Sequence, residues 1–412
     1  MINLFKIAIR NLIRYKRRTL LTASLITIGV VFVLVFVSIT GSFKAMMIGQ
    51  ITDSMLGHLQ IHHKGYVASI DNLPLNLNMK PQAYSKIAMV LTTFPQVEAF
   101  SPRLKFGGMF SNFAETTNIR LNGIIPDREF QTVPLLTSRI SEGKKTLSRG
   151  EIMIPTLLAK GLKVKIGDAV VVVATNADGS VNGKQFIVSG ILESATGPGG
   201  RDGYIHIDDA TEVLRMPEAE VSEVAIRLKD FSRLPAAVRQ LENKVSGEIN
   251  KEGRPIFEVH SWEQLSPFFN IARMIDVMTF FIKIMLIAIV LISIMNVMIM
   301  AVYERIREIG TIAAIGTLPG KIRSMFIIEG FCLGVVGAII GDLIGIAVVL
   351  IINLVGIRFD FGQQQGLLLK ATLQPSDLLT VSIIVIVVAV AASLQPAIKA
   401  SKMEPIEALR HV

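Results

Sequence analysis

Cysteine, tryptophan and charged side chains are scarce in this sequence. Its 412 residues include one cysteine, one tryptophan and five tyrosines, and Asp, Glu, Lys and Arg together make up 18%. The single cysteine, Cys332, excludes an intramolecular disulfide, so a domain in an oxidising compartment must be held together by its core. Internal repeats and low-complexity tracts are also missing, which argues against a solenoid or a disordered linker.

Signatures of nucleotide binding and catalysis are absent as well. The nearest approach to G-x-x-x-x-G-K-[ST], from Gly179 to Gln185, has the wrong spacing and lacks the hydroxyl residue. The glycine-rich run 197–200 has no strand-turn-helix context, and neither H-E-x-x-H nor G-x-S-x-G occurs. His58, His62 and His63 lack a placed carboxylate and are more typical of surface residues than of metal ligands. We therefore expect a chain that is not an enzyme and binds neither a metal nor a cofactor.

Hydrophobic residues, by contrast, make up 51% of the chain and gather in four runs. The runs are Leu20 to Ile39, Met274 to Val302, Met325 to Ile357 and Leu378 to Leu394. Each provides the roughly 20 apolar residues that a helix needs to cross a bilayer. The sequence therefore predicts a membrane protein with four transmembrane α-helices.

Positive charge is concentrated beside these runs. The segment from Lys44 to Ala272 holds 25 of the 42 basic residues and 24 of the 33 acidic ones, so it is nearly neutral although the chain carries +9. Because short loops rich in Lys and Arg stay in the cytoplasm, both termini are expected inside and the segment 44–272 outside. Topology thus explains the charge, and no nucleic acid partner is needed.

The first 18 residues have a pattern of their own. Lys6, Arg10, Arg14 and Arg17 recur at spacings of three and four, opposite apolar residues. This pattern predicts a basic amphipathic helix in the inner membrane interface. It either orients the first span or also contacts a cytoplasmic partner. Since no A-x-A-like site follows the first run, we expect an uncleaved signal anchor.

The external segment alternates strand-like and helix-like runs. Strand candidates are 58–62, 119–124, 151–154, 169–174, 185–191, 204–207, 223–228 and 256–260, and helix candidates are 82–94, 208–216 and 235–250. We predict a large α+β domain with an inserted lobe at about 115–220 and a hairpin tip at 176–183. Helical stretches from Lys44 to Met55 and from Trp262 to Lys283 would carry it as a two-helix stalk.

These predictions divide the chain into nine parts. They are an amphipathic helix 1–18, a first span 19–43, an external domain 44–272, a second span 273–302, a cytoplasmic helix 303–320, a third span 321–357, an external loop 358–375, a fourth span 376–395 and a cytoplasmic tail 396–412.

The third span is rich in small residues and contains two acids. Glycines recur every three or four residues, at Gly330, Gly334, Gly337, Gly341 and Gly345. Such a ridge lets another helix approach closely, either within the chain, from the second or fourth span, or across a dimer seam. Acids inside a membrane are costly, so Glu329 and Asp342 are candidate functional residues. Glu329 could instead form an interfacial ion pair with Arg323, whereas Asp342 has no obvious partner.

After the second span the chain reads Glu304-Arg305-Ile306-Arg307-Glu308-Ile309-Gly310-Thr311-Ile312-Ala313-Ala314-Ile315-Gly316. Taken alone, this is a short charged helix closed by glycine. It nevertheless resembles the E-R-x-R-E-I-G-x-x-x-A-I-G segment of permease subunits of MacB/FtsX-type ABC transporters. Further similar stretches are Ala8 to Leu12, Lys16 to Thr22, Glu329-Gly330, Pro396 to Arg410, Gly57 to Ile61, Gly123 to Pro126, Leu158 to Asp168 and Val188 to Ile191.

The resemblance implies a function by mechanotransmission. In that family a cytoplasmic ATPase dimer, which binds ATP and Mg²⁺, grips the helix after the second span, and a stalk converts its closure into movement outside. By position, the coupling residues here would be Glu304, Arg305, Arg307, Glu308, Ile309 and Gly310. The resemblance also implies a second permease copy, in a homo- or heterodimer, and a location in the inner membrane.

Within the family, chain length and layout are most similar to the lipoprotein-releasing permeases of the LolC/LolE type. That similarity implies lipoprotein cargo and a periplasmic carrier or adaptor. The tip at 176–183 is short for a LolC-type docking hairpin, which favours the LolE type or an unassigned branch. Alternatives are an FtsX-like transducer that regulates a cell-wall hydrolase and a MacB-like efflux permease.

Overall fold

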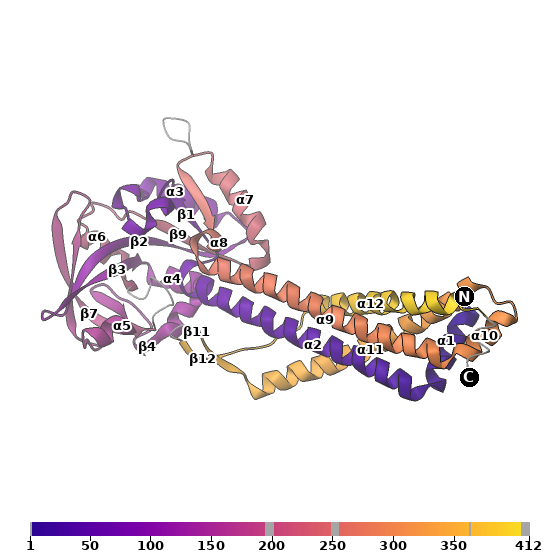
Figure 1. The fold of residues 1–412 in the computed structure, drawn as a ribbon. Helices are drawn as coiled ribbons and strands as arrows, with labels where there is room; N and C mark the ends of the chain where they lie inside the picture. The colour runs from indigo at the N-terminus through magenta and orange to yellow at the C-terminus, as the bar shows by residue number, and fades with distance from the viewer. Residues whose placement is uncertain (1, 194–201, 249–254, 362–363, 405–412) are drawn as a thin grey trace. The chain divides into compact units, whose positions relative to one another are not determined.

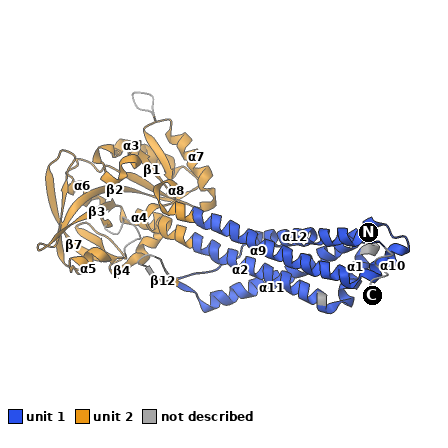
Figure 2. Ribbon diagram, viewed as in Figure 1, with its two compact units in different colours: residues 1–45, 273–358, 368–412 blue, residues 46–272, 359–367 orange. Residues whose placement is uncertain are grey.

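The protein is described by a computed structural model over residues 2–193, 202–248, 255–361 and 364–404. The chain divides into two compact units, shown in Figure 2. Unit 1 contains residues 1–45, 273–358 and 368–412, and unit 2 contains residues 46–272 and 359–367. The glycine-rich loop 197–200 and the last part of the family-like C-terminal stretch, residues 405–410, lie outside the described residues.

Unit 1 is helical. Its helices, drawn in Figure 1, are α1 (Ile2–Arg14), α2 (Lys16–Ile51), α9 (Phe268–Glu304), α10 (Ile306–Ala314), α11 (Pro319–Val355) and α12 (Pro375–Ser401), of which α2 and α9 also extend into unit 2. Four of them, α2, α9, α11 and α12, are long and apolar enough to cross a membrane, which confirms the predicted four spans. The fourth helix continues through Pro396 to Ser401, beyond the predicted end at 395.

The four long helices bury a shared apolar core in unit 1. Side chains from α2, α9, α11 and α12 meet there, among them Ile26, Leu34, Ile294, Phe326 and Val385. The outward faces are also apolar, with residues such as Phe32 and Leu350 more than half exposed. Helices that are apolar on every side suit a lipid environment.

Unit 2 is built on one mixed sheet. Its strands are β1 (Leu59–His63), β2 (Val97–Ser111), β3 (Thr116–Ile124), β4 (Ile140–Gly143), β5 (Glu151–Pro155), β6 (Ala169–Thr175), β7 (Val181–Leu192), β8 (Asp202–His206), β9 (Glu223–Leu228) and β10 (Phe257–Ser261). Its helices are α3 (Pro81–Thr92), α4 (Pro126–Thr132), α5 (Thr156–Gly161), α6 (Ile207–Val213), α7 (Leu234–Val245) and α8 (Trp262–Leu265). A separate pair, β11 (Arg358–Phe361) and β12 (Gln364–Leu368), forms a second small sheet.

The long strand β2 joins two parts of the main sheet. The first half of β2 pairs with β9, and this pairing adds β2 to the row of strands β10-β1-β9. Its second half pairs with β3 and β6, and the pairings β3-β8-β5-β7-β6 close a six-stranded ring back onto β2. The strands β3, β5, β6, β7 and β8 thus form a barrel together with β2, and both parts of the sheet belong to one compact unit.

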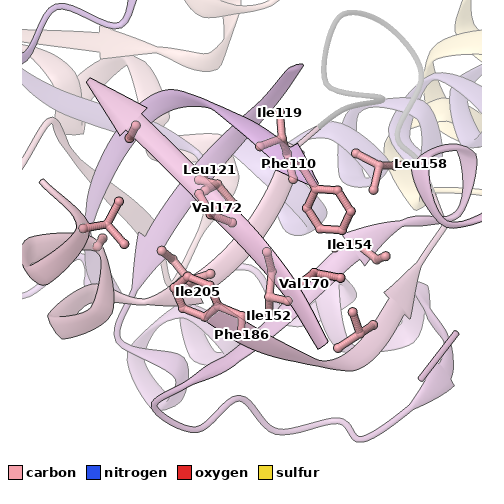
Figure 3. Packing of buried hydrophobic residues seen from close by; sticks show 14 of the residues in the cluster. Phe110, Ile119, Leu121, Ile152, Ile154, Leu158, Val170, Val172, Phe186 and Ile205 are labelled. Carbon is pink, nitrogen blue, oxygen red and sulfur yellow. The ribbon is translucent and has the colours of Figure 1, made fainter. Parts of the chain in front are cut away.

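Alternating side chains fill the barrel. Val170 and Val172 of β6 are fully buried, and they pack with Phe110, Leu121 and Phe186 in the cluster shown in Figure 3. Period-two burial is typical of a strand with one face on a core, and a closed ring leaves fewer free edges. This mixed sheet with helices confirms the predicted α+β fold class.

Two sequence predictions about unit 2 need correction. The fifteen-residue β2 was not predicted, because Pro102, Lys105 and the Gly107-Gly108 pair interrupt its apolar alternation. The continuous helix expected from Trp262 to Lys283 is broken, since α8 ends at Leu265 and α9 starts after Pro267. Proline favours a helix start and disfavours helical backbone in the residue before it. The two-helix stalk stays a prediction.

Candidate functional site at helix α10

Helix α10 is short because the chain bends at both of its ends. Arg305 has non-helical backbone angles, φ −110° and ψ 19°, and separates α9 from α10. Gly316 follows with φ +93°, in the left-handed region that glycine adopts without steric cost. The predicted 303–320 helix is therefore a nine-residue helix with an arginine hinge before it and a glycine turn after it.

Arg305 holds this helix to its neighbours. Its side chain is only 5% exposed, and its Nη1 donates to Glu329 Oε2 of α11 at 3.3 Å. Its Nε donates to Glu308 Oε2 at 3.2 Å, and the guanidinium carbon lies 5.1 Å from the centre of the Tyr15 ring. A buried arginine is tolerated only when its charge is paired, so this cluster fixes three helical segments around one side chain.

Glu308 connects the cluster to the N-terminal helices. The Tyr15 hydroxyl donates to Glu308 Oε1 at 2.9 Å, and Arg14 Nη1 lies 3.7 Å from the same oxygen. Burial opposes ionisation of Glu308, but the hydrogen bonds from Tyr15 and Arg305 and the two guanidinium charges outweigh it and lower its pKa. Glu308 is therefore ionised at neutral pH.

The two faces of α10 have different surroundings. Ile309 and Gly310 are buried against unit 1. Glu304 and Arg307 are exposed, and so are three apolar side chains at the end of the helix and just after it, Ile312, Ile315 and Leu318. Ile315 is 80% exposed. Exposed apolar residues beside charged ones are typical of a surface that binds another protein.

Sequence reasoning grouped the six predicted coupling residues in one helix, and the structure divides them. Glu304 ends α9, Arg305 is the hinge, and Arg307, Glu308, Ile309 and Gly310 lie on α10. Tyr15, which links the cluster to the N-terminal helices, was missed. Its only signal in the sequence is an aromatic residue within a basic stretch.

The expected pairing of Glu329 with Arg323 is wrong. Six residues on a helix correspond to about 600°, which places the two side chains on different faces. Glu329 is fully buried and pairs with Arg305, whereas Arg323 is exposed near the start of α11. Asp342, which lacked a partner in the sequence, accepts a hydrogen bond of 2.6 Å from Ser382 Oγ of α12.

The five glycines of the predicted ridge all face other helices of the same chain. A Cβ added at Gly330 or Gly334 would lie 2.7–2.8 Å from Ser393 or Ala389 of α12. At Gly337, Gly341 and Gly345 it would lie 2.5–2.9 Å from Ile26, Val30 and Leu34 of α2. Packing therefore involves the fourth span, as one prediction had it, and the first span in place of the second.

Unit 2 contains a separate buried charge cluster. Arg103 donates to Glu129 Oε1 at 2.9 Å and to Glu223 Oε1 at 2.9 Å, and all three side chains are at most 4% exposed. Burial disfavours the charged form of Glu223, but Lys105, His62 and Arg103 outweigh it and hold its pKa well below the usual range. Arg103 lies on β2, Glu223 on β9 and Glu129 on α4, so the cluster ties two neighbouring strands to that helix.

The three histidines that were considered as metal ligands have different surroundings. His58 Nε2 lies 3.3 Å from Asp53, His62 is buried beside Glu223, and His63 Nδ1 lies 3.1 Å from the Lys64 carbonyl oxygen. Within the described residues, His, Cys, Asp and Glu form no group of three or more that could hold a metal ion.

Two family models match the chain. A model described as the MacB-like periplasmic core domain matches residues 19–244, more than half of the sequence. A second, described as the FtsX-like permease C-terminal region, matches residues 280–405, which include α10 and the glycine-rich α11. Together the two matches include residues of both units.

Curated relatives are similar over most of the chain. The lipoprotein-releasing system transmembrane protein LolC of Neisseria meningitidis is 25% identical over 95% of this chain and 94% of its own. LolE of Haemophilus influenzae is 22% identical over 76% of this chain and 78% of its own. These identities do not distinguish a LolC-type from a LolE-type chain. The macrolide export protein MacB of Nitrobacter winogradskyi is 27% identical over 56% of this chain and 34% of its own.

The chain is also similar to solved structures of extracytoplasmic domains. The periplasmic region of MacB from Actinobacillus actinomycetemcomitans is 12% identical and covers 53% of this chain and 92% of its own, with a TM-score of 0.35. The extracellular domain of YknZ, from Gram-positive bacteria, is 14% identical and covers 49% and 99%, with a TM-score of 0.34.

Proposed function

Because this chain belongs to the family of ABC-transporter permeases with a MacB-like periplasmic core domain and an FtsX-like C-terminal region, we propose that it couples ATP hydrolysis by a separate ATPase dimer to movement of unit 2. Its cargo is lipoprotein, released from the inner membrane by a dimer of this permease with itself or a related chain. The similarity to LolC over 95% of the sequence supports the cargo assignment.

The observation that carries the coupling proposal is the two-sided nature of α10. One face is held by Arg305 and Glu308 to α11 and to Tyr15, through side chains that are buried or half-buried. The other face presents Ile312 and Ile315 beside charged residues. A protein that bound the exposed face and moved would displace α10 together with the helices tied to it.

The length of α2 and α9 supports transmission through the membrane. They contain 36 and 37 residues, or about 54 Å of helix at 1.5 Å per residue, against about 30 Å of hydrocarbon. Lys44 of α2 and Asp276 of α9 form an ion pair at 2.6 Å. Because charged residues avoid the hydrocarbon, this pair would mark the outer surface, and the residues beyond it would form the stalk.

Docking and transmission can be separated experimentally. Ile315→Asp should abolish co-purification of the ATPase, because it places a charge on the proposed docking face. Glu329→Gln and Gly310→Val should retain the ATPase but uncouple hydrolysis from lipoprotein release, because they alter the buried side. The matched control is Phe113→Asp, an equally drastic change at an exposed phenylalanine of unit 2.

The measurements are ATPase co-purification and ATP-dependent release of a triacylated lipoprotein from proteoliposomes. If Ile315→Asp retains the ATPase and release, α10 is not the docking helix. If ATPase activity ignores lipoprotein but responds to a cell-wall hydrolase or an efflux adaptor, the cargo assignment is wrong and the transducer or efflux function replaces it.

A further inference from the structure

A cavity of about 760 Å³ lies at the junction of α1 and α2, against the last turns of α9. Its lining includes the cationic side chains Arg14, Lys16 and Arg17, and the apolar side chains Leu21, Val297 and Met300. All of these residues belong to unit 1. The volume is within the range of small-ligand sites. Arg14, Tyr15 and Glu304 of the coupling region line part of it, but Lys16, Arg17 and the apolar residues lie outside that cluster.

The lining changes from charged to apolar along the helices. The three cations immediately precede the apolar part of α2, which starts at Leu20. Leu21 and Met300, 62% and 63% exposed, continue the surface toward the hydrophobic part of each helix. Lys and Arg at the end of a span lie at headgroup level. The cavity therefore offers positive charge where lipid phosphates lie and apolar surface where acyl chains lie.

We propose that this cavity is a binding site for an anionic phospholipid. The phosphate is bound by Lys16 and Arg17 with Arg14, and an acyl chain lies along Leu21, Val297 and Met300 between α2 and α9. Glu304 also lines the cavity, so the lining retains an excess of two positive charges, which favours an anionic headgroup over a zwitterionic one. The site is distinct from the cargo and adjoins the proposed ATPase surface, with which it shares Glu304.

A second copy of the chain fits the cavity less well. In a two-fold dimer whose axis passes through this patch, the three cations Arg14, Lys16 and Arg17 would approach the same three cations of the second copy. Like charges brought together in a low-dielectric environment repel strongly. A lipid phosphate neutralises the same three cations, and the surrounding bilayer supplies the lipid at high concentration.

Native mass spectrometry of the full-length chain, delipidated in detergent and mixed with equal amounts of phosphatidylglycerol and phosphatidylcholine, tests the proposal. The wild type should retain phosphatidylglycerol preferentially, and Lys16→Gln/Arg17→Gln should lower that preference about tenfold. The matched control is Lys321→Gln/Arg323→Gln, which removes the same charge from exposed positions near the start of α11. This control should keep the preference.

Three results would overturn the proposal. Equal losses in both charge pairs would mean diffuse attraction of lipid to a basic surface. Displacement of phosphatidylglycerol by excess inorganic phosphate would mean a site for a soluble anion. Efficient disulfide dimers of Leu21→Cys, in a Cys332→Ala background, would mean that a second copy covers the cavity. Conversely, Leu21→Trp should weaken retention of long-chain more than short-chain phosphatidylglycerol, because it fills the apolar part.

Discussion

The two units of this chain are stabilised by different forces. Unit 2 encloses an apolar barrel core whose side chains, such as Phe110 and Val172, are removed from water on folding. In unit 1 the surroundings of the long helices are lipid, which is as apolar as the helix contacts themselves, so burial from solvent contributes little. There the helices approach closely at glycines instead, as at Gly337 and Gly341 against α2.

Two buried arginines, Arg103 and Arg305, also differ between the units. Arg103 of unit 2 lies among strands whose register is fixed by hydrogen bonds, and its carboxylate partners are fully buried. Arg305 of unit 1 lies at a break between two helices, and one of its partners, Glu308, is 39% exposed. A charge cluster inside a sheet holds one arrangement, whereas a cluster at a hinge with a solvent-exposed member can respond to a partner.

Two native residues report separately on the two units. Trp262, the single tryptophan, is 3% exposed in unit 2, and its fluorescence follows unfolding there. Cys332, the single cysteine, is 8% exposed in α11 of unit 1, and its reaction with thiol reagents follows opening of the helices.

The largest effect is expected for Arg103→Leu. It leaves Glu129 buried without its cation and Glu223 with Lys105 alone, so unit 2 should lose about 5 kcal/mol of stability or fail to fold. Urea unfolding followed by Trp262 fluorescence measures the loss. The matched Lys86→Leu removes a cation from an exposed pair with Glu248 and should cost less than about 1 kcal/mol. Similar losses in the two variants would show that the Arg103 cluster contributes little.

Leucine truncation should distinguish the two units directly. Leu121→Ala in the barrel should cost about 2–5 kcal/mol, since it loses both transfer free energy and packing. Leu34→Ala on α2 should cost less, because in lipid only the packing loss remains. Trp262 fluorescence reports the first change, and Cys332 labelling in mixed micelles the second. Equal costs would contradict the proposed difference in driving force.

Glycine substitution tests the close approach in unit 1. Gly341→Ala should open the α2–α11 contact, because its Cβ would lie 2.6 Å from Val30 Cβ, at a cost of about 1–3 kcal/mol. Gly320→Ala, at an open position of the same helix, should instead stabilise by up to about 1 kcal/mol through helix propensity. Faster Cys332 labelling in the first variant only is the expected result. If both variants behave alike, the seam is not tightly packed.

The smallest effect concerns the pH response of Glu308. Its pKa is lowered in the folded chain, so its contribution to stability is present above the unfolded-state pKa and is lost as the pH falls through the folded-state value. Tyr15→Phe removes one hydrogen bond and raises the folded-state pKa, so the loss should be complete at a higher pH, with a cost of about 1 kcal/mol or less. Reaction of Cys332 with dithiodipyridine, which labels thiols in acid, measures this. An unchanged pH profile would mean that Tyr15 does not stabilise the carboxylate.

Much of the architecture could be predicted because it depends on local pattern. The four spans follow from run length, and strands such as β6 and β9 follow from short apolar or β-branched runs. The strand β2 was not predicted because several of its residues have roles that interrupt the apolar alternation of a strand. Arg103 and Lys105 pair with buried carboxylates, and Gly108 allows the backbone of β6 to approach, since a Cβ there would lie 2.8 Å from the Val173 carbonyl oxygen.

The sequence predicts which segment contains the candidate site, but not how the side chains of the site are arranged in space. The residues from Glu304 to Gly310 form a recognisable stretch, and their charge and glycine turn are visible in the sequence. The partners of Arg305 come from positions 24 residues later and 290 residues earlier, at Glu329 and Tyr15. No periodicity within a window relates residues so far apart, because tertiary packing alone brings them together.

The shape of the guanidinium at Arg305 has a mechanical consequence. Its donors lie in one rigid plane, so the Nε and Nη1 bonds set a fixed spacing between the carboxylates of Glu308 and Glu329. If α10 slides along α11, one of these two bonds breaks. If the two helices move as one body, both bonds are kept. A lysine at this position would keep the charge and lose the spacing, turning a rigid joint between the two helices into a loose one.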